Sequence, residues 1–460
     1  MLCLPKTGIK MGNRYQELEA RLIFKIEDKR IRRADADMYH LNGLVCRLIR
    51  QDFISKATID ETYRLMRTLA ERISGIEPEE TFDKIVKDNI TSSTKAIDGY
   101  LHYFHKTKPV FTQKRENSIV EMLAKMYGEA AFTKLRNLCK NLPHEEKNEY
   151  SRLLENMNYD PGTNDIPEFR EKANNNLPDI ERMLEKYMSY LGFNDGIMQF
   201  DMNLAPFGYD FSFWDGNSFK VFFDPEKIIF YRGKNKTKTY RGHWYLTGIH
   251  EFVGHALQQK FSEKMPLSLR CGPKNFNHIT GGTNSEGAAM FTEIYSMDWF
   301  NQKSTQEFLN LGRDDMRLMN VFVETYLFNK TVQAMHDILE AKERQTSVKS
   351  RYESVKDSHE ELSKITGMHY YEINLNSVGH RDMNETIEDL SYVFGTRHMK
   401  HIWTRFKRHI WENYNSHQRV LNKNKHLLLR GMLSGQFRSD VQYEFLTKVY
   451  LPRIEDFLES

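Results

Sequence analysis

Cysteine is scarce in this sequence, and its few occurrences form no pattern. The 460 residues include 4 cysteines, and no two of them are close enough to form a CxxC pair. Scattered thiols of this kind exclude a disulfide framework and a thiolate metal site, and they are typical of a protein that keeps its cysteines reduced. We therefore expect a cytoplasmic protein.

Long apolar runs and an excess of charge are also missing. No uncharged apolar stretch approaches the roughly 20 residues that cross a bilayer, and the first residues lack the apolar core of a signal peptide. The 66 basic and 63 acidic residues leave a net charge of only +3. We therefore expect no membrane partner, and the small net charge gives no general reason to expect nucleic acid.

Helical periodicity dominates the chain, which predicts a mainly α fold. In one example Thr58 and Glu61 form a capping box, which predicts a helix that begins at Thr58 and ends at Gly75. No repeat of fixed period is present, which argues against a solenoid. A polar stretch over residues 156–176 is the best candidate for a subdomain boundary. We expect an N-terminal helical region, residues 1–192, and a second helical region that includes the β-hairpin, residues 193–460.

A β pattern interrupts the helices between residues 207 and 231. Phe211 to Trp214 precede the turn dipeptide Asp215-Gly216, and Phe219 to Phe223 follow it, which predicts a small hairpin. A further strand-like run covers Ile228 to Tyr231. Two interpretations of the hairpin remain open: its edge holds an extended peptide by backbone hydrogen bonds, or it merely caps the core.

The most informative stretch follows the hairpin. Four residues spell HExxGH: His250, Glu251, Gly254 and His255. Neutral imidazoles suit Zn²⁺, and a glutamate beside the first histidine can take a proton from a metal-activated water. Apolar residues at helical spacing surround the motif and place it on a buried helix. They are Leu246, Ile249, Val253 and Leu257.

The spacing of the two histidines is unusual for a helix. His250 and His255 are five residues apart, which separates them by roughly 140° around a regular α-helix, so one metal cannot bind both. We therefore predict a π-type bulge that absorbs one residue, at the position that Gly254 permits. Downstream, Glu286 in the segment Ser285-Glu-Gly-Ala-Ala provides a third ligand and leaves one metal position open for water.

These segments resemble a known family. His250 to Gln258 and Glu286 to Glu293 are similar to the signature of domain-of-unknown-function family 885, which is taken to be a helical, zinc-dependent, carboxypeptidase-like family of gluzincin metallopeptidases. Its pattern runs HExxPGHHxQ, then EGWAxYAE, then Tyr-x-x-Gly. This chain lacks one residue before Gly254 and has Ala288 in place of tryptophan. Its histidine spacing is instead similar to that of dipeptidyl peptidase III, whose EExxAD motif is absent around Glu286.

The resemblance implies roles for further residues. Glu293 lies two helical turns after Glu286 and is expected either to accept a hydrogen bond from a ligand histidine or to lie on the surface. Tyr392, three residues before Gly395, matches Tyr-x-x-Gly and is the first candidate for a donor to the developing oxyanion. The other candidates for catalysis or substrate binding are Arg397 (a partner for a substrate carboxylate), His398 and His380.

The sequence thus predicts a helical, metallopeptidase-like fold with a deep cleft that holds one Zn²⁺. We expect the protein to hydrolyse peptide bonds in short peptides, as a carboxypeptidase or oligopeptidase does. Glu251 is the expected general base. Two alternatives remain: an inactive scaffold with the same fold, and a nucleic-acid binder that uses the basic segment 397–430. That segment is also consistent with a solvated basic face whose aromatic residues face the core. The oligomeric state cannot be predicted from the sequence.

Overall fold

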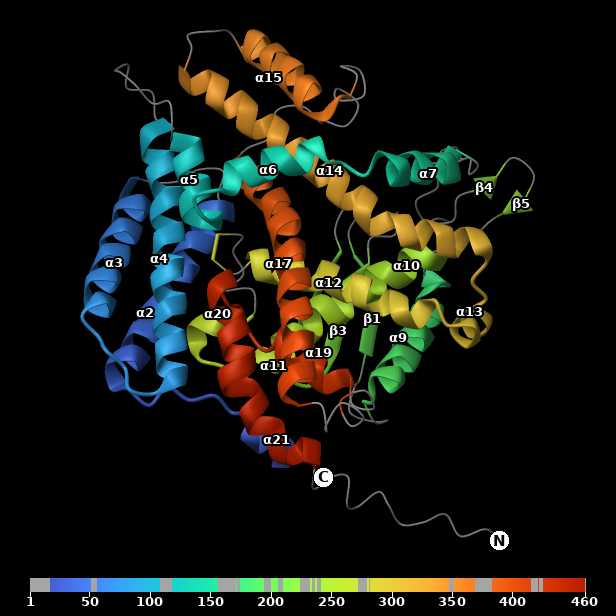
Figure 1. Ribbon diagram of the computed structural model, residues 1–460, viewed down its shortest axis with the longest axis horizontal. Helices are drawn as coiled ribbons and strands as arrows, with labels where there is room; N and C mark the ends of the chain where they lie inside the picture. Colours follow the sequence, from blue (N-terminus) through green and yellow to red (C-terminus); the bar gives the residue numbers. More distant parts are fainter. Residues whose placement is uncertain are drawn as a thin grey trace.

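The computed structural model describes most of the chain, and the fold is mainly α, as predicted (Figure 1). The described residues are 17–50, 56–107, 118–155, 171, 174–193, 200–205, 210–223, 232–233, 236–237, 241–271, 279–280, 282–346, 351–368, 383–414, 421 and 425–459. Within this part of the chain, no helix is both long and apolar enough to cross a membrane.

The N-terminal region is a series of amphipathic helices, of which α2, α3 and α4 lie side by side at one end of the molecule (Figure 1). Its helices are α2 (Lys29–Arg50), α3 (Lys56–Ser74), α4 (Thr81–Thr107), α5 (Ser118–Tyr127), α6 (Ala131–Lys140), α7 (His144–Glu155) and α9 (Leu177–Leu191). The predicted end at Gly75 is confirmed, but the predicted start at Thr58 is wrong. Thr58 lies inside α3, where its carbonyl accepts a hydrogen bond from the Thr62 hydroxyl at 2.7 Å, so it is a helix residue and not a cap.

The predicted hairpin is confirmed, and it belongs to a three-stranded sheet. Strands β2 (Phe211–Trp214) and β3 (Phe219–Phe223) pair antiparallel around Gly216, which has a φ of +99° that favours glycine. Strand β1 (Phe200–Leu204), which the sequence did not reveal, pairs parallel with β3. The predicted run Ile228 to Tyr231 lies outside the described residues. A second pair of strands, β4 (Arg232–Gly233) and β5 (Lys236–Thr237), is short.

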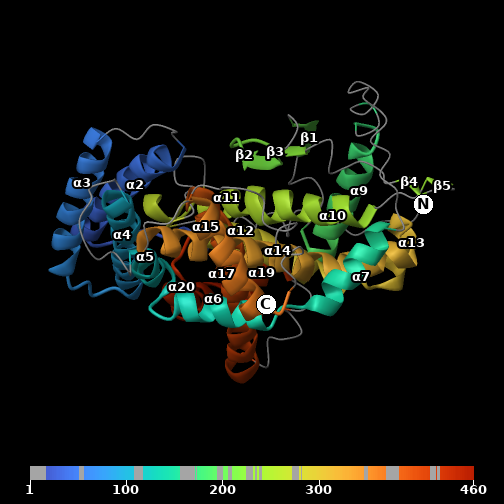
Figure 2. The same cartoon turned by 90° about the horizontal axis from the view of Figure 1, so that it is seen from above.

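The HExxGH helix lies in the middle of a layered arrangement. It consists of α10 (Arg241–Gly248), η2 (Ile249–Ala256) and α11 (Leu257–Ser262) in direct succession. The three-stranded sheet covers one side of it, and α12 (Gly282–Phe300) covers the other (Figure 2). Beyond α12 lies α17 (Met383–Asn413), which packs against both α12 and α14 (Arg313–Thr346).

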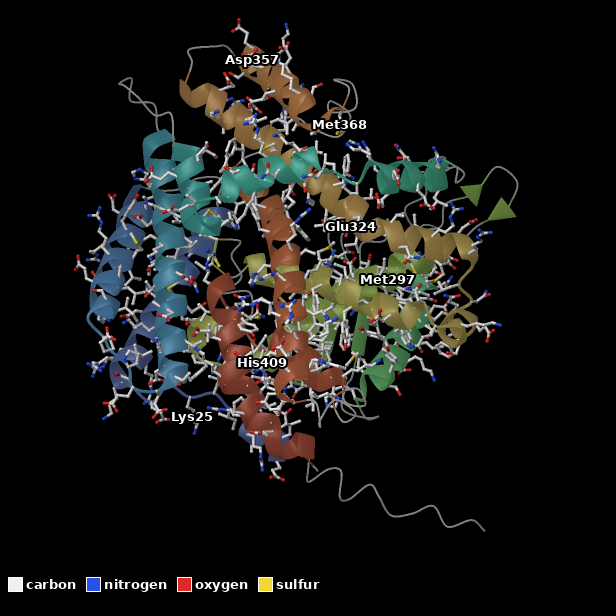
Figure 3. The ribbon with its side chains drawn as sticks, viewed as in Figure 1. Lys25, Met297, Glu324, Asp357, Met368 and His409 are labelled. Carbon is white, nitrogen blue, oxygen red and sulfur yellow. The ribbon has the colours of Figure 1, made fainter. Side chains whose placement is uncertain are left out.

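The remaining elements complete the helical framework, and side chains fill the space between the ribbons (Figure 3). They are η3 (Leu267–Leu269), α13 (Lys303–Leu309), α15 (Arg351–Thr366), α19 (Lys425–Leu433), α20 (Ser439–Glu444), η5 (Phe445–Tyr450) and α21 (Leu451–Glu459). In the basic part of α17, Phe406 is buried whereas Lys407 and Arg408 are exposed, as on a solvated basic face. Trp411 departs from this pattern and is 59% exposed.

One hydrophobic core extends across both predicted regions. Its buried members run from Leu18 in the N-terminal region to Ile454 in the last helix. They include Phe252 of the HExxGH helix, whose ring lies 4.9 Å from that of Phe219 in β3. Most of the polar stretch 156–176 lies outside the described residues. The core therefore fixes the HExxGH helix relative to the sheet and to the helices behind it.

Candidate metal centre

The HExxGH segment forms a π-helix, as its histidine spacing predicted. Element η2 spans Ile249–Ala256, and in a π-helix the hydrogen-bonded residues are five apart, so such residues lie one above the other. The rings of His250 and His255 consequently lie on the same side of the helix, with centroids 5.0 Å apart and planes at 80°. The extra residue therefore brings both imidazoles to one place.

Glycine at position 254 is required by the close approach of two helices. A Cβ atom at Gly254 would lie 2.3 Å from the Cα atom of Ala289 on α12, which is far below any normal contact. A second close approach occurs on the opposite side of α12, where a Cβ atom at Gly287 would lie 2.3 Å from the carbonyl carbon of Gly395 on α17. Small residues thus let α12 fit tightly between η2 and α17 and bring all three elements to the site.

Three ligand-type side chains converge where these helices meet. Glu286 Oε2 lies 3.6 Å from His250 Nε2 and 3.6 Å from His255 Nε2, and all three ligand atoms lie within 4.8 Å of one another. Ligand bonds of about 2.1 Å at tetrahedral angles place neighbouring ligand atoms about 3.4 Å apart. The two 3.6 Å distances in the triad formed by His250, His255 and Glu286 are therefore close to the ligand spacing of a small divalent cation.

Hydrogen bonds on the far side of each imidazole orient the triad. Glu293 Oε1 lies 2.6 Å from His250 Nδ1, and Ser285 Oγ lies 3.2 Å from His255 Nδ1. With Nδ1 bonded in this way, the Nε2 atom of each ring faces the common point. The structure thus shows the expected hydrogen bond between Glu293 and a triad histidine, and Glu293 is buried and not a surface carboxylate.

The electrostatics of the site favour a cation. Burial raises the pKa of both Glu251 and Glu293. Burial acts in the same direction on Glu286, but the two imidazoles outweigh it and hold the pKa of Glu286 well below its ordinary value. Burial opposes charge on His250, but Glu286 and Glu293 raise the pKa of His250 well above its ordinary value. One oxygen of Glu286 and one of Glu251 are buried without a hydrogen-bond partner, as expected beside a position that a cation occupies.

Tyr392 lies beside the triad, as its Tyr-x-x-Gly setting predicted. Its ring centroid is 6.3 Å from that of His250. Burial raises the pKa of Tyr392 well above its ordinary value, and the charge of Glu286 raises it further, so the hydroxyl stays protonated and can donate. Two residues of α14 pack around it: the Tyr326 ring at 5.3 Å and the Lys330 ammonium at 5.0 Å from its centroid. Lys330 is itself fixed by an ion pair with buried Asp389 at 2.6 Å.

The strand β2 lies against η2 beside Glu251. The Ser212 hydroxyl donates to the Glu251 carbonyl at 2.6 Å, and the charge of Asp210 contributes to the raised pKa of Glu251. The side-chain amide of Gln259 occupies part of the outer edge of β2: it donates to the Ser212 carbonyl at 3.2 Å and accepts from the Trp214 N–H at 3.1 Å. An extended peptide therefore cannot pair with these two backbone groups of β2 while Gln259 holds them.

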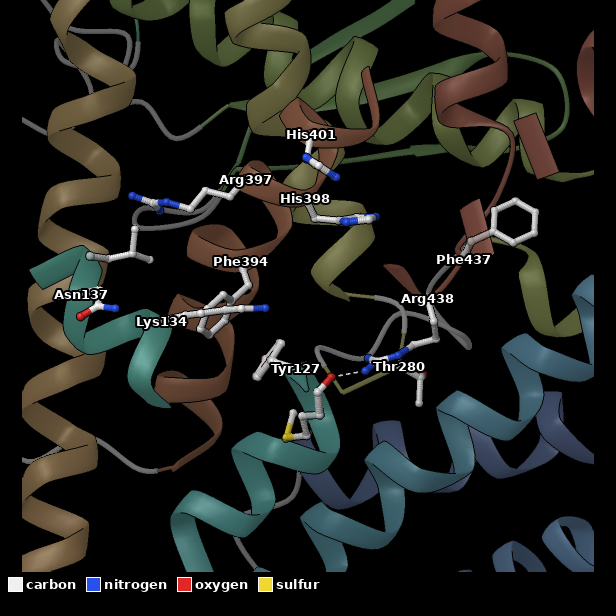
Figure 4. A pocket seen from close by; sticks show the side chains of 12 residues that line it. Tyr127, Lys134, Asn137, Thr280, Phe394, Arg397, His398, His401, Phe437 and Arg438 are labelled. Carbon is white, nitrogen blue, oxygen red and sulfur yellow. Dashed lines mark hydrogen bonds between the residues drawn. The ribbon is translucent and has the colours of Figure 1, made fainter. Parts of the chain in front are cut away.

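Arg397 and His398 are not brought to the triad. Both line a separate cavity on another face of α17, and no triad residue lines that cavity (Figure 4). The reason is geometric, because Arg397 lies five residues after Tyr392 and points roughly 140° away around a regular helix. His380 lies outside the described residues.

Several residues of the site were not predicted from the sequence. Ser285 precedes Glu286 directly, so a search for hydrogen-bonding neighbours of the ligands would have found it. Tyr326, Lys330 and Gln259 offer no such signal, because only the packing of α14 and β2 brings them to the site. No protein-family model matches this chain, and no curated protein matches it significantly.

Proposed function

We propose that this protein is a zinc-dependent peptidase that cleaves short peptides. The observation that carries the proposal is the convergence of His250 Nε2, His255 Nε2 and Glu286 Oε2, with the carboxylate of Glu251 on the same π-helix. Two imidazoles and one carboxylate are the ligand set of many catalytic zinc sites, which keep a fourth position open. The resemblance of the two sequence segments to zinc-dependent gluzincins supports the same class.

The charge of the site supports a divalent ion. Three buried carboxylates, those of Glu251, Glu286 and Glu293, lie close to only two imidazoles, and Glu286 and Glu293 hold the pKa of His250 well above its ordinary value. A divalent ion at the triad would supply the positive charge that this proton supplies without it. A bound Zn²⁺ would supply Lewis acidity toward a substrate carbonyl and would activate a water molecule. Its nitrogen-rich ligand set favours zinc over magnesium or calcium, which prefer oxygen.

Glu251 and Tyr392 perform the proton transfer and the charge stabilisation in this proposal. Glu251, whose pKa burial raises above its ordinary value, accepts a proton from the attacking water and then delivers it to the leaving amine. The protonated hydroxyl of Tyr392 donates a hydrogen bond to the oxygen on which negative charge develops. Lys330 and Tyr326 hold the Tyr392 ring in place for this role.

Access to the site favours small substrates. The side chains of His250 and His255 are only 12% and 13% exposed. At the edge of β2, Gln259 occupies the Ser212 carbonyl and the Trp214 N–H, which shortens the edge that a peptide can pair with. A peptide that pairs with this short edge engages few residues on one side of the cleaved bond. We therefore propose carboxypeptidase- or oligopeptidase-like cleavage of short peptides.

The experiment compares wild-type protein with Glu251→Gln. We expect about one zinc per chain in both proteins by elemental analysis, because this substitution changes no ligand. Cleavage of a peptide library, read by mass spectrometry, should fall at least about 100-fold in Glu251→Gln, since an amide cannot accept the proton. Glu263→Gln, the same change at an exposed position just after α11, is the matched control and should retain full activity.

Two outcomes would contradict the proposal in different ways. Full zinc content in His255→Ala would show that the triad does not hold the metal. A wild-type protein that binds zinc but cleaves no peptide in the library would favour the inactive scaffold.

A further inference from the structure

The cavity that contains Arg397 and His398 has the chemistry of a second, separate binding site. It has a volume of about 470 Å³, which is within the usual range for small-molecule sites. Helices α5, α6 and α17 and the segment before α20 form its walls (Figure 4). The lining residues include Tyr127, Lys134, Phe394, Arg397, His398 and Arg438.

The charge of the cavity is of one sign. Three of its lining residues are permanent cations, namely Lys134, Arg397 and Arg438, and two are histidines. No acidic residue is among the described residues that line it. The chain as a whole is nearly neutral, so this concentration of positive charge is a local feature. A concave surface lined by cations concentrates the field and attracts anions.

Backbone carbonyls hold the two arginines of the cavity in place. Arg438 donates to the carbonyls of Ile279 and Met126, and Arg397 donates to the carbonyl of Val393. Burial lowers the pKa of Arg397, and the charge of Glu324 only partly offsets this. Glu324, which lies on α14 (Figure 3), forms an ion pair with Lys400 at 2.9 Å.

Apolar rings form the rest of the wall. The rings of Tyr127 and Phe394 lie 4.9 Å apart, and Phe437 lines the cavity beside Arg438. In Figure 4, Lys134 extends along Phe394 toward the space that Tyr127, His398 and Arg438 surround. A ligand that fits this arrangement has an oxyanion for the cations and a flat apolar part for the rings.

We propose that this cavity binds a small molecule that combines a phosphate or carboxylate group with an aromatic or other flat apolar group. The site is independent of the metal centre, because the two lie on different faces of α17. The Lys134 ammonium and the Arg438 guanidinium, which extend toward the same space (Figure 4), recognise the oxyanion. Tyr127 and Phe394 contact the apolar group.

The test uses three probes that share a ring: phenyl phosphate, benzoate and phenol. Isothermal titration calorimetry on the full-length protein should show that phenyl phosphate binds at least about tenfold more tightly than phenol, which lacks the charge. Benzoate distinguishes the two oxyanions: tighter binding of benzoate than of phenyl phosphate assigns the site to carboxylates, and the reverse assigns it to phosphates. The affinity of the preferred anion should fall as salt concentration rises.

Variants locate the binding. Lys134→Gln and Arg438→Gln should each weaken binding of the preferred anion about tenfold or more. The matched controls are Arg136→Gln on α6 and Arg408→Gln on α17, which are exposed positions outside the cavity and should leave the affinity unchanged. Glu251→Gln, which removes the proposed catalytic base, should also bind the probe normally.

Equal affinity for phenol and both anions would overturn the proposal, and so would binding that Lys134→Gln and Arg438→Gln leave unchanged. A crystal structure with the probe bound away from Lys134 and Arg438 would have the same consequence. Thermal unfolding of each variant without probe shows whether a lost affinity comes from a lost fold.

Discussion

Replacing Gly254 by alanine tests the packing that assembles the candidate metal centre. The new Cβ atom would lie 2.3 Å from Ala289 Cα and 2.5 Å from Ala289 Cβ. Nonbonded carbon atoms rest at about 3.5 Å or more, so η2 and α12 must separate by roughly 1 Å. Neither contact atom is the end of a flexible side chain, so the backbone itself has to move.

The expected magnitude comes from two opposing effects. Overpacking a tight core costs about 1–3 kcal/mol, whereas alanine in a helix is favoured over glycine by about 1 kcal/mol. Because the clash is with a backbone atom, we expect the upper end of the first range and a net loss of about 1–2 kcal/mol. Glu286 lies on α12, three residues before Ala289, so the same displacement moves its carboxylate away from His250 and His255. We expect zinc affinity to fall at least about tenfold.

Two measurements check this prediction. Urea unfolding gives the change in stability, and titration with a competing chelator gives the change in zinc affinity. The control is Gly75→Ala, where a Cβ atom meets nothing within 4 Å, and it should retain both stability and zinc affinity. In the double variant Gly254→Ala with Ala289→Gly, the 2.5 Å contact disappears but the 2.3 Å contact remains, so we expect partial recovery only. Wild-type stability and zinc affinity in Gly254→Ala would refute the packing argument.

Three further predictions follow from contacts at and away from the site. Tyr392→Phe should lower kcat about 100-fold or more while zinc content stays constant, because the substitution removes only the hydroxyl donor. Steady-state kinetics with any cleaved peptide measures kcat, and an unchanged kcat would contradict the prediction. Glu293→Gln should weaken zinc binding about 10–100-fold, since the buried carboxylate at 2.6 Å orients His250; chelator titration measures the loss, and Glu263→Gln should show none. Finally, burial raises the pKa of Glu19, but Arg430 and Lys264 outweigh it and hold that pKa at about 2, against an ordinary value of 4.5. The resulting stabilisation, at most about 3 kcal/mol, is present above pH 4.5 and is lost as the pH falls through 2. The difference in unfolding free energy between wild type and Glu19→Gln, measured by urea unfolding, should therefore be largest at neutral pH and shrink toward pH 2. A difference that does not depend on pH would contradict the lowered pKa of Glu19.

The sequence was most informative where a feature depends on residues close together in the chain. The hairpin follows from Asp215-Gly216 between two aromatic runs, and the π-helix follows from two histidines five residues apart that must face one ion. Both are consequences of local backbone geometry, so a short stretch contains all the information that they require. The capping box at Thr58 was misleading, because α3 already includes Lys56.

The zinc, the peptidase activity and the relation to gluzincins are still predictions. Their basis in the sequence is a motif, and the structure adds to it the convergence of His250, His255 and Glu286. Glu293 illustrates how the structure separates alternatives that the sequence left open. Its position two turns after Glu286 suited a surface carboxylate as well as a hydrogen-bond partner, and only its burial against His250 distinguishes the two.

Only the tertiary structure decided which distant residues share the site. Tyr392 reaches the triad because Gly287 meets Gly395, whereas Arg397, five residues later on the same helix, lines another cavity. Tyr326 and Lys330 arrive with α14, and Gln259 occupies the edge of β2 through its side chain. Sequence periodicity assigns a residue to a face of its own helix, but it does not say which element that face meets. That choice depends on how closely whole helices can approach one another, and here small residues on three of them set it.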